Sequence, residues 1–151
     1  MVNWYLDSEV SIDFSETPHV GIRYIMPSDS EETKKSVKKY PFINKRDLTV
    51  RLGDIKNERV YEFGIPKGYC YDGASIPRLF WRVIGSPTDN SFLIAALVHD
   101  VLCENHQYVM NDRIFSTKVF NALLKASQVG KIKRFLMKNS VDIFQKLCCH
   151  W

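Results

Sequence analysis

The stretch "DLTVRLGDIKNERVYEFGI", residues 47–65, decides the fold class because its side chains alternate as they do in paired strands. Every second residue from Leu48 to Leu52 is apolar, which is the period-two pattern of a half-buried strand. "VYEFGI" at 60–65 alternates again, and the polar "KNER" between the two runs is suited to a turn. Pro66 should end the second strand, because proline cannot donate to a β-ladder. We therefore expect a β-hairpin.

Outside that hairpin, the first half contains one more strand candidate and one polar segment. "HVGIRYIM" at 19–26 is predicted to be a strand, whereas "PSDSEETKKSVKKYP" at 27–41 is polar and bounded by prolines. Such a composition is typical of a surface loop, which here could include a short helix.

Helical patterns take over after about residue 89. Apolar residues recur at helical spacing in 88–105, 111–127 and 129–149, and N-cap residues begin the first two segments. The last segment has lysines on one side and apolar residues on the other, namely Ile132, Phe135, Leu136, Ile143 and Leu147. Strands followed by helices favour an α+β fold. We expect a small antiparallel β-sheet in the N-terminal half, packed on about three C-terminal helices.

Length and composition favour one soluble domain over residues 1–151. Hydrophobic residues make up 45% of the chain and charged residues 25%, as in ordinary globular proteins. The four cysteines lack the spacing of a disulfide framework, which favours the cytoplasm. The N-terminus does not resemble a signal peptide, and no apolar run approaches the length of a membrane span. We therefore expect no membrane partner.

The net charge of +4 conceals a gradient along the chain. Residues 1–32 contain seven acidic residues against Arg23, and residues 113–151 contain eight basic residues against Asp142. The basic third could face an anionic partner or substrate. The simpler interpretation is a solvated helix surface that faces the acidic N-terminal part. No nucleic-acid recognition motif accompanies the modest charge, so we do not expect a nucleic-acid partner.

Two ionisable residues stand side by side in the apolar run "AALVHDVLCEN", residues 95–105. At helical spacing His99 shares a face with apolar residues and should point inward, while Asp100 lies about 100° around the helix, in line with Glu104. Buried ionisable groups are costly unless they are paired, so both residues need polar partners. A hydrogen-bonded core histidine is the structural alternative to a catalytic His99.

The stretch "DGASIPRLFW", residues 72–81, supplies such partners in Asp72, Ser75 and Arg78. Its glycine and proline favour a tight, rigid loop. Arg78 could grip a carboxylate or a phosphate with its planar guanidinium. Asp72 could ligate a metal or orient His99. In the structural alternative, Asp72 and Ser75 cap turns and Arg78 forms an ion pair with Asp100.

A third acid and the C-terminal tail complete the candidates. Asp112 is near the start of the following helix and could reach the same site across a helical hairpin, although aspartate is also a favoured N-cap. The tail "CCHW" contains the soft ligands Cys148, Cys149 and His150, but their spacing matches no known zinc site. We interpret the tail as a helix end.

The segments "GYCYDGASIPRLFWRVIGSP", "AALVHDVLCEN" and "NDRIF" together resemble the phage and bacterial family known as domain of unknown function 1353. Its pattern of Asp-x-x-Ser-x-Pro-Arg, His-Asp-x-Leu and a later Asp falls here on Asp72, Ser75, Pro77, Arg78, His99, Asp100 and Asp112. The resemblance covers roughly residues 47–126. Cys103 departs from it, because the family usually has tyrosine there. The resemblance implies a shared site, and a host-cell cytoplasmic location if the chain is phage-encoded, but no particular reaction.

Two functions fit these residues. The first is a hydrolase acting on a small anionic substrate such as one containing phosphate, with Ser75 and Arg78 binding it and a catalytic set of Asp72, His99, Asp100 and Asp112. A divalent metal ion held by that set would activate water, whereas without a metal His99 would act as general base. The alternative is a non-enzymatic phage accessory protein that binds a host protein or a small signalling ligand. The sequence predicts no oligomeric state.

Overall fold

The hairpin forms as expected in the structure, a computed structural model that describes residues 1–72, 90–110 and 112–148. Strands β5 (Leu48–Asp54) and β6 (Arg59–Ile65) pair antiparallel, with Leu48 opposite Ile65 and Asp54 opposite Arg59. The apolar residues of β5 are buried at every second position, and Phe63 and Ile65 are buried on β6. The period-two pattern therefore identified the face of the hairpin that contacts the core.

The hairpin belongs to the larger of two antiparallel sheets. β1 (Val2–Leu6) and β2 (Val10–Phe14) extend it in the order β1-β2-β5-β6. A smaller sheet has the order β3-β4-β7 and is made from β3 (Val20–Ile22), β4 (Phe42–Asn44) and β7 (Cys70–Tyr71). Because β7 pairs with β4 only at its two residues, the chain leaves the smaller sheet directly after Tyr71.

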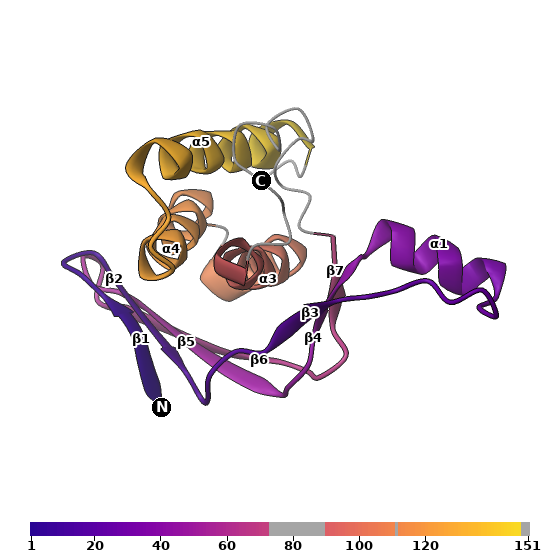
Figure 1. Cartoon of the computed structure of the whole chain (residues 1–151). Coiled ribbons are helices and arrows are strands. Elements are labelled where there is room, and N and C mark those ends of the chain that lie inside the picture. The colour runs from indigo at the N-terminus through magenta and orange to yellow at the C-terminus, as the bar shows by residue number, and fades with distance from the viewer. Residues whose placement is uncertain (73–89, 111, 149–151) are drawn as a thin grey trace.

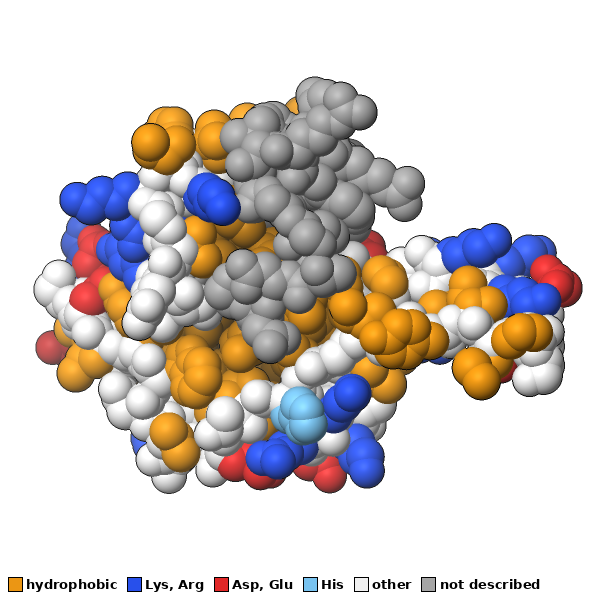
Figure 2. Space-filling model, in the orientation of Figure 1, with side chains coloured by type: hydrophobic (Ala, Val, Ile, Leu, Met, Phe, Trp, Pro, Cys, Tyr) orange, Lys and Arg blue, Asp and Glu red, His pale blue; other side chains and the backbone are white. Residues whose placement is uncertain are grey.

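The segment between β3 and β4 contains the short helix that the sequence allowed. The strand expected at 19–26 is limited to β3, and helix α1 (Glu31–Lys39) follows. The Ser30 hydroxyl caps this helix by accepting the Thr33 backbone N–H at 3.1 Å. α1 projects away from the rest of the molecule (Figure 1), and Figure 2 shows its lysine side chains on that projection.

The second half is helical, so the expected α+β class is confirmed. Helices α3, α4 and α5 lie above the larger sheet (Figure 1), and a short 3₁₀ helix, η1, connects α3 to α4. Their bounds are α3 (Asn90–Glu104), η1 (His106–Val109), α4 (Arg113–Ala126) and α5 (Lys131–Cys148). Among the described residues, no helix combines the length and the apolar character needed to cross a bilayer.

Helix α3 is the centre of the core. The sequence predicted one inward face containing His99, but both sides of the helix are buried: Leu93, Leu97 and Val98 are as inaccessible as Ala95 and Leu102. The reason is that α3 packs against α4 and also against the strand layer, including β3. The polar side chains of α3 are therefore placed inside the protein.

Helix α5 turns its predicted apolar side outward. Ile132, Phe135, Ile143 and Leu147 are exposed, with 79% of Ile132 and 67% of Phe135 accessible. The side that packs toward α4 instead buries Met137, Val141 and Gln145. A polar residue, Gln145, thus occupies the inner face of α5 while larger apolar residues lie outside, which the amphipathic pattern did not predict.

Candidate functional site

Two carboxyl groups from distant parts of the chain meet at the end of β7. Asp72 follows Tyr71 directly, and Asp100 projects from the middle of α3. Tyr71 joins the two elements, because its hydroxyl donates to the Leu93 carbonyl of α3 at 2.9 Å. The two groups are near enough for Asp72 to raise the pKa of Asp100, through its negative charge and through side-chain hydrogen bonding. A hydrogen bond between two carboxyl groups requires a proton on one of them.

The environment of Asp100 favours the protonated form of its carboxyl group. Its residue is only 8% exposed, and burial is the main reason that its pKa is raised from 3.8 to about 6. The hydrogen bond and charge of His99 lower this pKa, whereas the charge and hydrogen bond of Asp72 raise it. The pKa of Asp100 therefore lies near the pH range in which general acids and bases are most effective.

His99 is buried and held from two sides. It is 1% exposed, and its Nδ1 lies 3.9 Å from Oδ1 of Asp100. Its Nε2 lies 2.6 Å from the amide nitrogen of Gln145, and the edge of its ring meets Phe120 at a centroid distance of 5.3 Å. Sγ of Cys103 is 3.7 and 3.6 Å from the two ring nitrogens, so it is not directed at either one of them.

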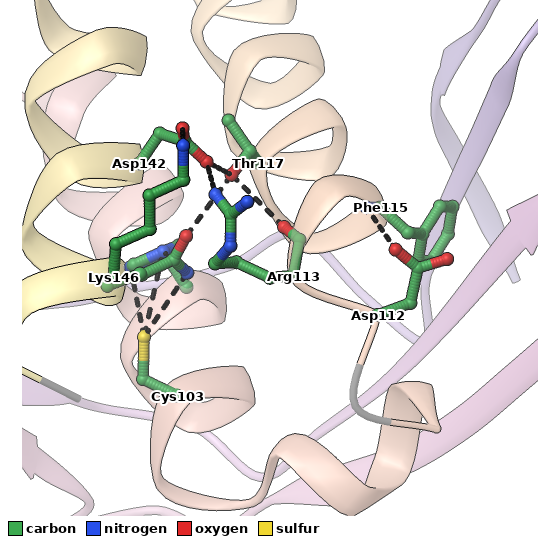
Figure 3. Close-up of polar contacts among 9 residues, drawn as sticks. Cys103, Asp112, Arg113, Phe115, Thr117, Asp142 and Lys146 are labelled. Carbon is green, nitrogen blue, oxygen red and sulfur yellow. Dashed lines mark hydrogen bonds and ion pairs between the residues drawn. The ribbon is translucent and has the colours of Figure 1, made fainter. Parts of the chain in front are cut away.

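A polar chain continues from His99 through the helices, and Figure 3 shows its far end at Thr117, Asp142, Arg113 and Lys146. The Thr117 hydroxyl lies 3.2 Å from Oε1 of Gln145 and 3.4 Å from Oδ1 of Asp142. Asp142 forms ion pairs with Arg113 and with Lys146. The buried histidine is thus connected through Gln145 and Thr117 to an ion-pair cluster between α4 and α5.

Two tyrosines border the carboxyl pair on the other side. The Tyr69 hydroxyl donates to Glu104 at 2.7 Å, and the rings of Tyr69 and Tyr71 stack at 6.4 Å. Burial raises the pKa of both phenols, and the negative charge of Asp100 adds to this effect. Both tyrosines therefore stay protonated beside the carboxyl groups.

The candidate residues from the sequence fall into three groups. Asp72, His99 and Asp100 come together. Asp112 is the N-cap of α4 and accepts the Phe115 backbone N–H at 2.9 Å, pointing away from the Arg113 cluster in Figure 3. Ser75 and Arg78, together with the tail residues Cys149 and His150, lie outside the described residues.

A metal centre was one form of the hypothesis for Asp72, His99, Asp100 and Asp112. Across residues 1–72, 90–110 and 112–148, no three His, Cys, Asp or Glu side chains form a group that could hold a metal ion.

Three neighbours of the site were not identified from the sequence: Gln145, Thr117 and Tyr69. Tyr69 stood within the quoted motif and could have been found as an aromatic residue near Asp72. Gln145 recurs four residues after Val141 and eight after Met137, so its helical phase was a signal that it shares their buried face. Thr117 carried no comparable signal.

The basic C-terminal third interacts with the acidic N-terminal part within the described residues. Nζ of Lys118 on α4 lies 3.4 Å from Oε1 of Glu9 before β2. Burial acts to raise the pKa of Asp7, but hydrogen bonds from Glu9, Tyr5 and Val10, with the charge of Lys125, lower it overall. Some of the basic residues of the C-terminal third therefore interact with acidic residues of the N-terminal part.

Comparisons with known proteins connect this site to a family without a stated activity. The model of the family described as "Protein of unknown function (DUF1353)" matches residues 50–141, which include Asp72, His99, Asp100 and Asp112 but end before Gln145. No solved structure matches the chain.

Two similar curated proteins come from Sinorhizobium fredii. The uncharacterized protein y4jT is 42% identical over 48 residues, which are 32% of this chain and 14% of that protein. The uncharacterized protein y4iH is 34% identical over 73 residues, which are 48% of this chain and 29% of that protein. The matched segments span less than a third of either relative.

Proposed function

We propose that this chain, which belongs to the DUF1353 family of proteins of unknown function, is a hydrolase that uses Asp72 and Asp100 as a proton-sharing carboxyl pair. The observation that carries the proposal is the buried position of Asp100 beside His99 and Asp72, where burial and the charge of Asp72 raise its pKa to about 6. Two carboxyl groups this close cannot both be ionised cheaply, so one serves as acid while the other serves as base.

The reaction divides between the two carboxyl groups. The carboxylate of Asp72 removes a proton from a water molecule, whose oxygen attacks the substrate. The carboxylic acid of Asp100, whose side chain is 10% exposed whereas that of His99 is 0% exposed, gives its proton to the oxygen that leaves. Each such proton transfer typically contributes about 10²–10⁴-fold to the rate. After product release, a proton passes from Asp72 to Asp100 across their hydrogen bond, which restores the starting state.

In this proposal His99 supports the carboxyl pair and does not contact the substrate. Both ring nitrogens already face protein groups, Asp100 on one side and Gln145 on the other. The ring is also 1% exposed, whereas Asp72 is partly accessible. Asp72 is therefore the better candidate for contact with water or substrate.

The proposed substrate is a small molecule that contains an anionic group, such as a phosphate ester. Arg78 and Ser75 follow Asp72 closely in sequence, and we assign them the binding of that group. We also propose that the chain acts in the cytoplasm, and in the host cytoplasm if a phage encodes it. In support, the four cysteines do not have the spacing of a disulfide framework, as expected for a reducing compartment.

The test is hydrolysis of chromogenic esters by the purified chain. para-Nitrophenyl phosphate, bis(para-nitrophenyl) phosphate and para-nitrophenyl acetate would be followed by nitrophenolate release between pH 5 and 8, with and without a chelator. We expect hydrolysis of a phosphate ester that the chelator does not remove. Asp72→Asn and Asp100→Asn should each reduce it by about 10²-fold or more.

The matched control is Asp13→Asn. Asp13 is a β2 carboxylate that accepts a hydrogen bond from Asn3 at 2.9 Å and lies in a different element from the pair. Its substitution should leave the rate unchanged. No hydrolysis of any of these esters by the wild type, or equal rates for the wild type and both site variants, would reject the proposal.

A binding role is the second candidate, because α5 exposes apolar side chains. Ile132, Phe135, Ile143 and Leu147 are exposed on it, and the same helix carries exposed lysines. Exposed apolar groups of this kind are typical of protein-binding surfaces. If binding is the function, Phe135→Ser should weaken association with a host protein identified by cross-linking, while Asp100→Asn should not. The opposite pattern would favour the hydrolase.

A further inference from the structure

The partners of Gln145 assign it a role in the carboxyl-pair site. Its side chain is on the inner face of α5 and its residue is 0% exposed. The amide nitrogen is 2.6 Å from Nε2 of His99, and the amide oxygen is 3.2 Å from the Thr117 hydroxyl. A buried amide with both ends in contact has little freedom to turn, so it can impose a proton position on its neighbours.

We infer that Gln145 is a positioning residue that holds neutral His99 as the Nδ1–H tautomer, with this N–H directed at Asp100. The inference adds a residue to the site of the proposed hydrolase, and its relevance to catalysis rests on that proposed function.

The donor and acceptor groups fix the tautomer. Nδ1 of His99 faces a carboxyl oxygen of Asp100 at 3.9 Å, and a hydrogen on Nδ1 is favourable there. Nε2 then carries the lone pair and accepts an N–H from Gln145. The amide oxygen of Gln145 is then on the side of the Thr117 hydroxyl, at 3.2 Å, and this hydroxyl is also 3.1 Å from the Arg113 carbonyl. The opposite tautomer would direct the Nδ1 lone pair toward the carboxyl oxygen, with no hydrogen between them when Asp100 is ionised.

The tautomer matters because of what it does to Asp100. An N–H directed at the Asp100 carboxylate stabilises the ionised form and lowers its pKa, which opposes burial and the charge of Asp72. Tyr69 and Tyr71 also face Asp100, while Cys103 and the Phe120 ring contact His99. Of the groups around the His99 ring, the Gln145 amide makes the shortest contact with Nε2, so its removal should change the proton position most.

The experiment is ¹⁵N NMR of the histidine rings in the full chain, which separates the protonated from the unprotonated ring nitrogen. At pH 8 the wild type should show His99 as the Nδ1–H tautomer. Gln145→Met, which keeps the size but removes the hydrogen bonds, should lose this preference. Gln145→Glu should reverse it, because a carboxylate can only accept and would hold the proton on Nε2.

A second measurement follows the Asp100 carboxyl group by ¹³C NMR. Its titration midpoint should move upward in Gln145→Met by about one pH unit, because the N–H that lowered the pKa is no longer held in place. Asn139→Met is the matched control: it changes an exposed amide on the same helix whose nitrogen donates to the Phe135 carbonyl at 2.8 Å. It should alter neither spectrum.

The outcomes separate the two proposals. A wild-type His99 in the Nε2–H form at pH 8 would overturn the inference without any variant, even if the chain hydrolyses esters. The Nδ1–H form in the wild type, its loss in Gln145→Met and an upward titration of Asp100 would support the inference even if no ester is hydrolysed. An unchanged tautomer in both Gln145→Met and Gln145→Glu would also overturn it.

Discussion

The middle of α3 and the start of α4 use the same residue type for opposite purposes. Asp100 is buried among apolar side chains, and its carboxyl group lies near that of Asp72. Asp112 is partly exposed, and its carboxylate accepts a backbone N–H at the first turn of α4. A carboxylate at an N-cap stabilises a helix, whereas an acid inside a core costs stability. Asp100, whose burial costs stability, is therefore a better candidate for a catalytic role than Asp112.

The largest difference between the two regions should be in packing. Leu97, on α3 beside the site residues, is 0% exposed, whereas Ile114, in the first turn of α4, is 62% exposed. Leu97→Ala should lower the free energy of unfolding by about 2–5 kcal/mol, through lost burial and a cavity. Ile114→Ala should change it by less than about 0.5 kcal/mol. Urea unfolding measures both, and similar losses would mean that α3 is not the centre of the core.

The second effect concerns the pH dependence of stability. The unfolded chain releases the Asp100 proton near its ordinary pKa of 3.8, but the folded protein holds it up to about 6. The unfolded state therefore binds fewer protons between these values, and the free energy of unfolding contributed by Asp100 falls as the pH rises through them. The contribution of Asp100 to the free energy of unfolding is constant below the lower pKa and above the higher one. The difference in pKa corresponds to about 3 kcal/mol.

Asp100→Asn tests this linkage, because asparagine does not titrate. The free energy of unfolding of the variant minus that of the wild type should rise by about 3 kcal/mol as the pH increases from 4 to 7. Urea unfolding at a series of pH values provides the comparison, and Asp112→Asn is the control from the other region. Parallel curves for the wild type and Asp100→Asn would show that Asp100 titrates alike in the folded and unfolded chain.

A smaller effect is expected at the start of α4. Asp112→Ala removes the acceptor for the Phe115 N–H and should lower the free energy of unfolding by about 1 kcal/mol. Asp112→Asn should recover most of this loss, because asparagine caps helices about as well. Thermal melts of the three proteins are sufficient. A loss of ester hydrolysis in Asp112→Asn with normal stability would return Asp112 to the catalytic set.

The sequence predicted the helices and strands better than the contacts between them. Alternation along β5 and β6 and helical spacing in α3 and α4 are local properties, so the α+β class and the buried position of His99 followed from them. Whether Asp72 reaches Asp100 depends on how β7 is placed against α3, which no local pattern encodes. From the sequence, Asp72 could ligate a metal or orient His99, and its proximity to Asp100 follows only from the position of β7, which the Tyr71 hydroxyl joins to the Leu93 carbonyl of α3.

Helix α5 shows that a local pattern also does not determine which face of a helix is buried. Its apolar residues recur at helical spacing, and the pattern alone favoured burying that face. The helix packs instead through Met137, Val141 and Gln145, because the polar group of Gln145 finds His99 and Thr117 inside. A buried glutamine with specific partners outweighed a simple apolar stripe, and its partners come from two other helices.

The smallest expected effect tests what the basic third of the chain does. Lys118 on α4 and Glu9 before β2 form an ion pair of 3.4 Å between partly exposed side chains. Such pairs contribute about 0.2–1 kcal/mol and are screened by salt. Lys118→Gln should therefore lower the free energy of unfolding by less than about 1 kcal/mol at low salt, and by less at high salt. Urea unfolding at two ionic strengths gives both values.

The control and the kinetics decide between the two interpretations of the charge gradient. Lys133→Gln removes an exposed lysine from α5 and should leave the stability unchanged. If the basic residues serve only the fold, neither substitution should alter the KM for a phosphate ester at low salt. If Lys133→Gln raises that KM and added salt abolishes the difference, the basic third attracts the anionic substrate, as long-range steering requires.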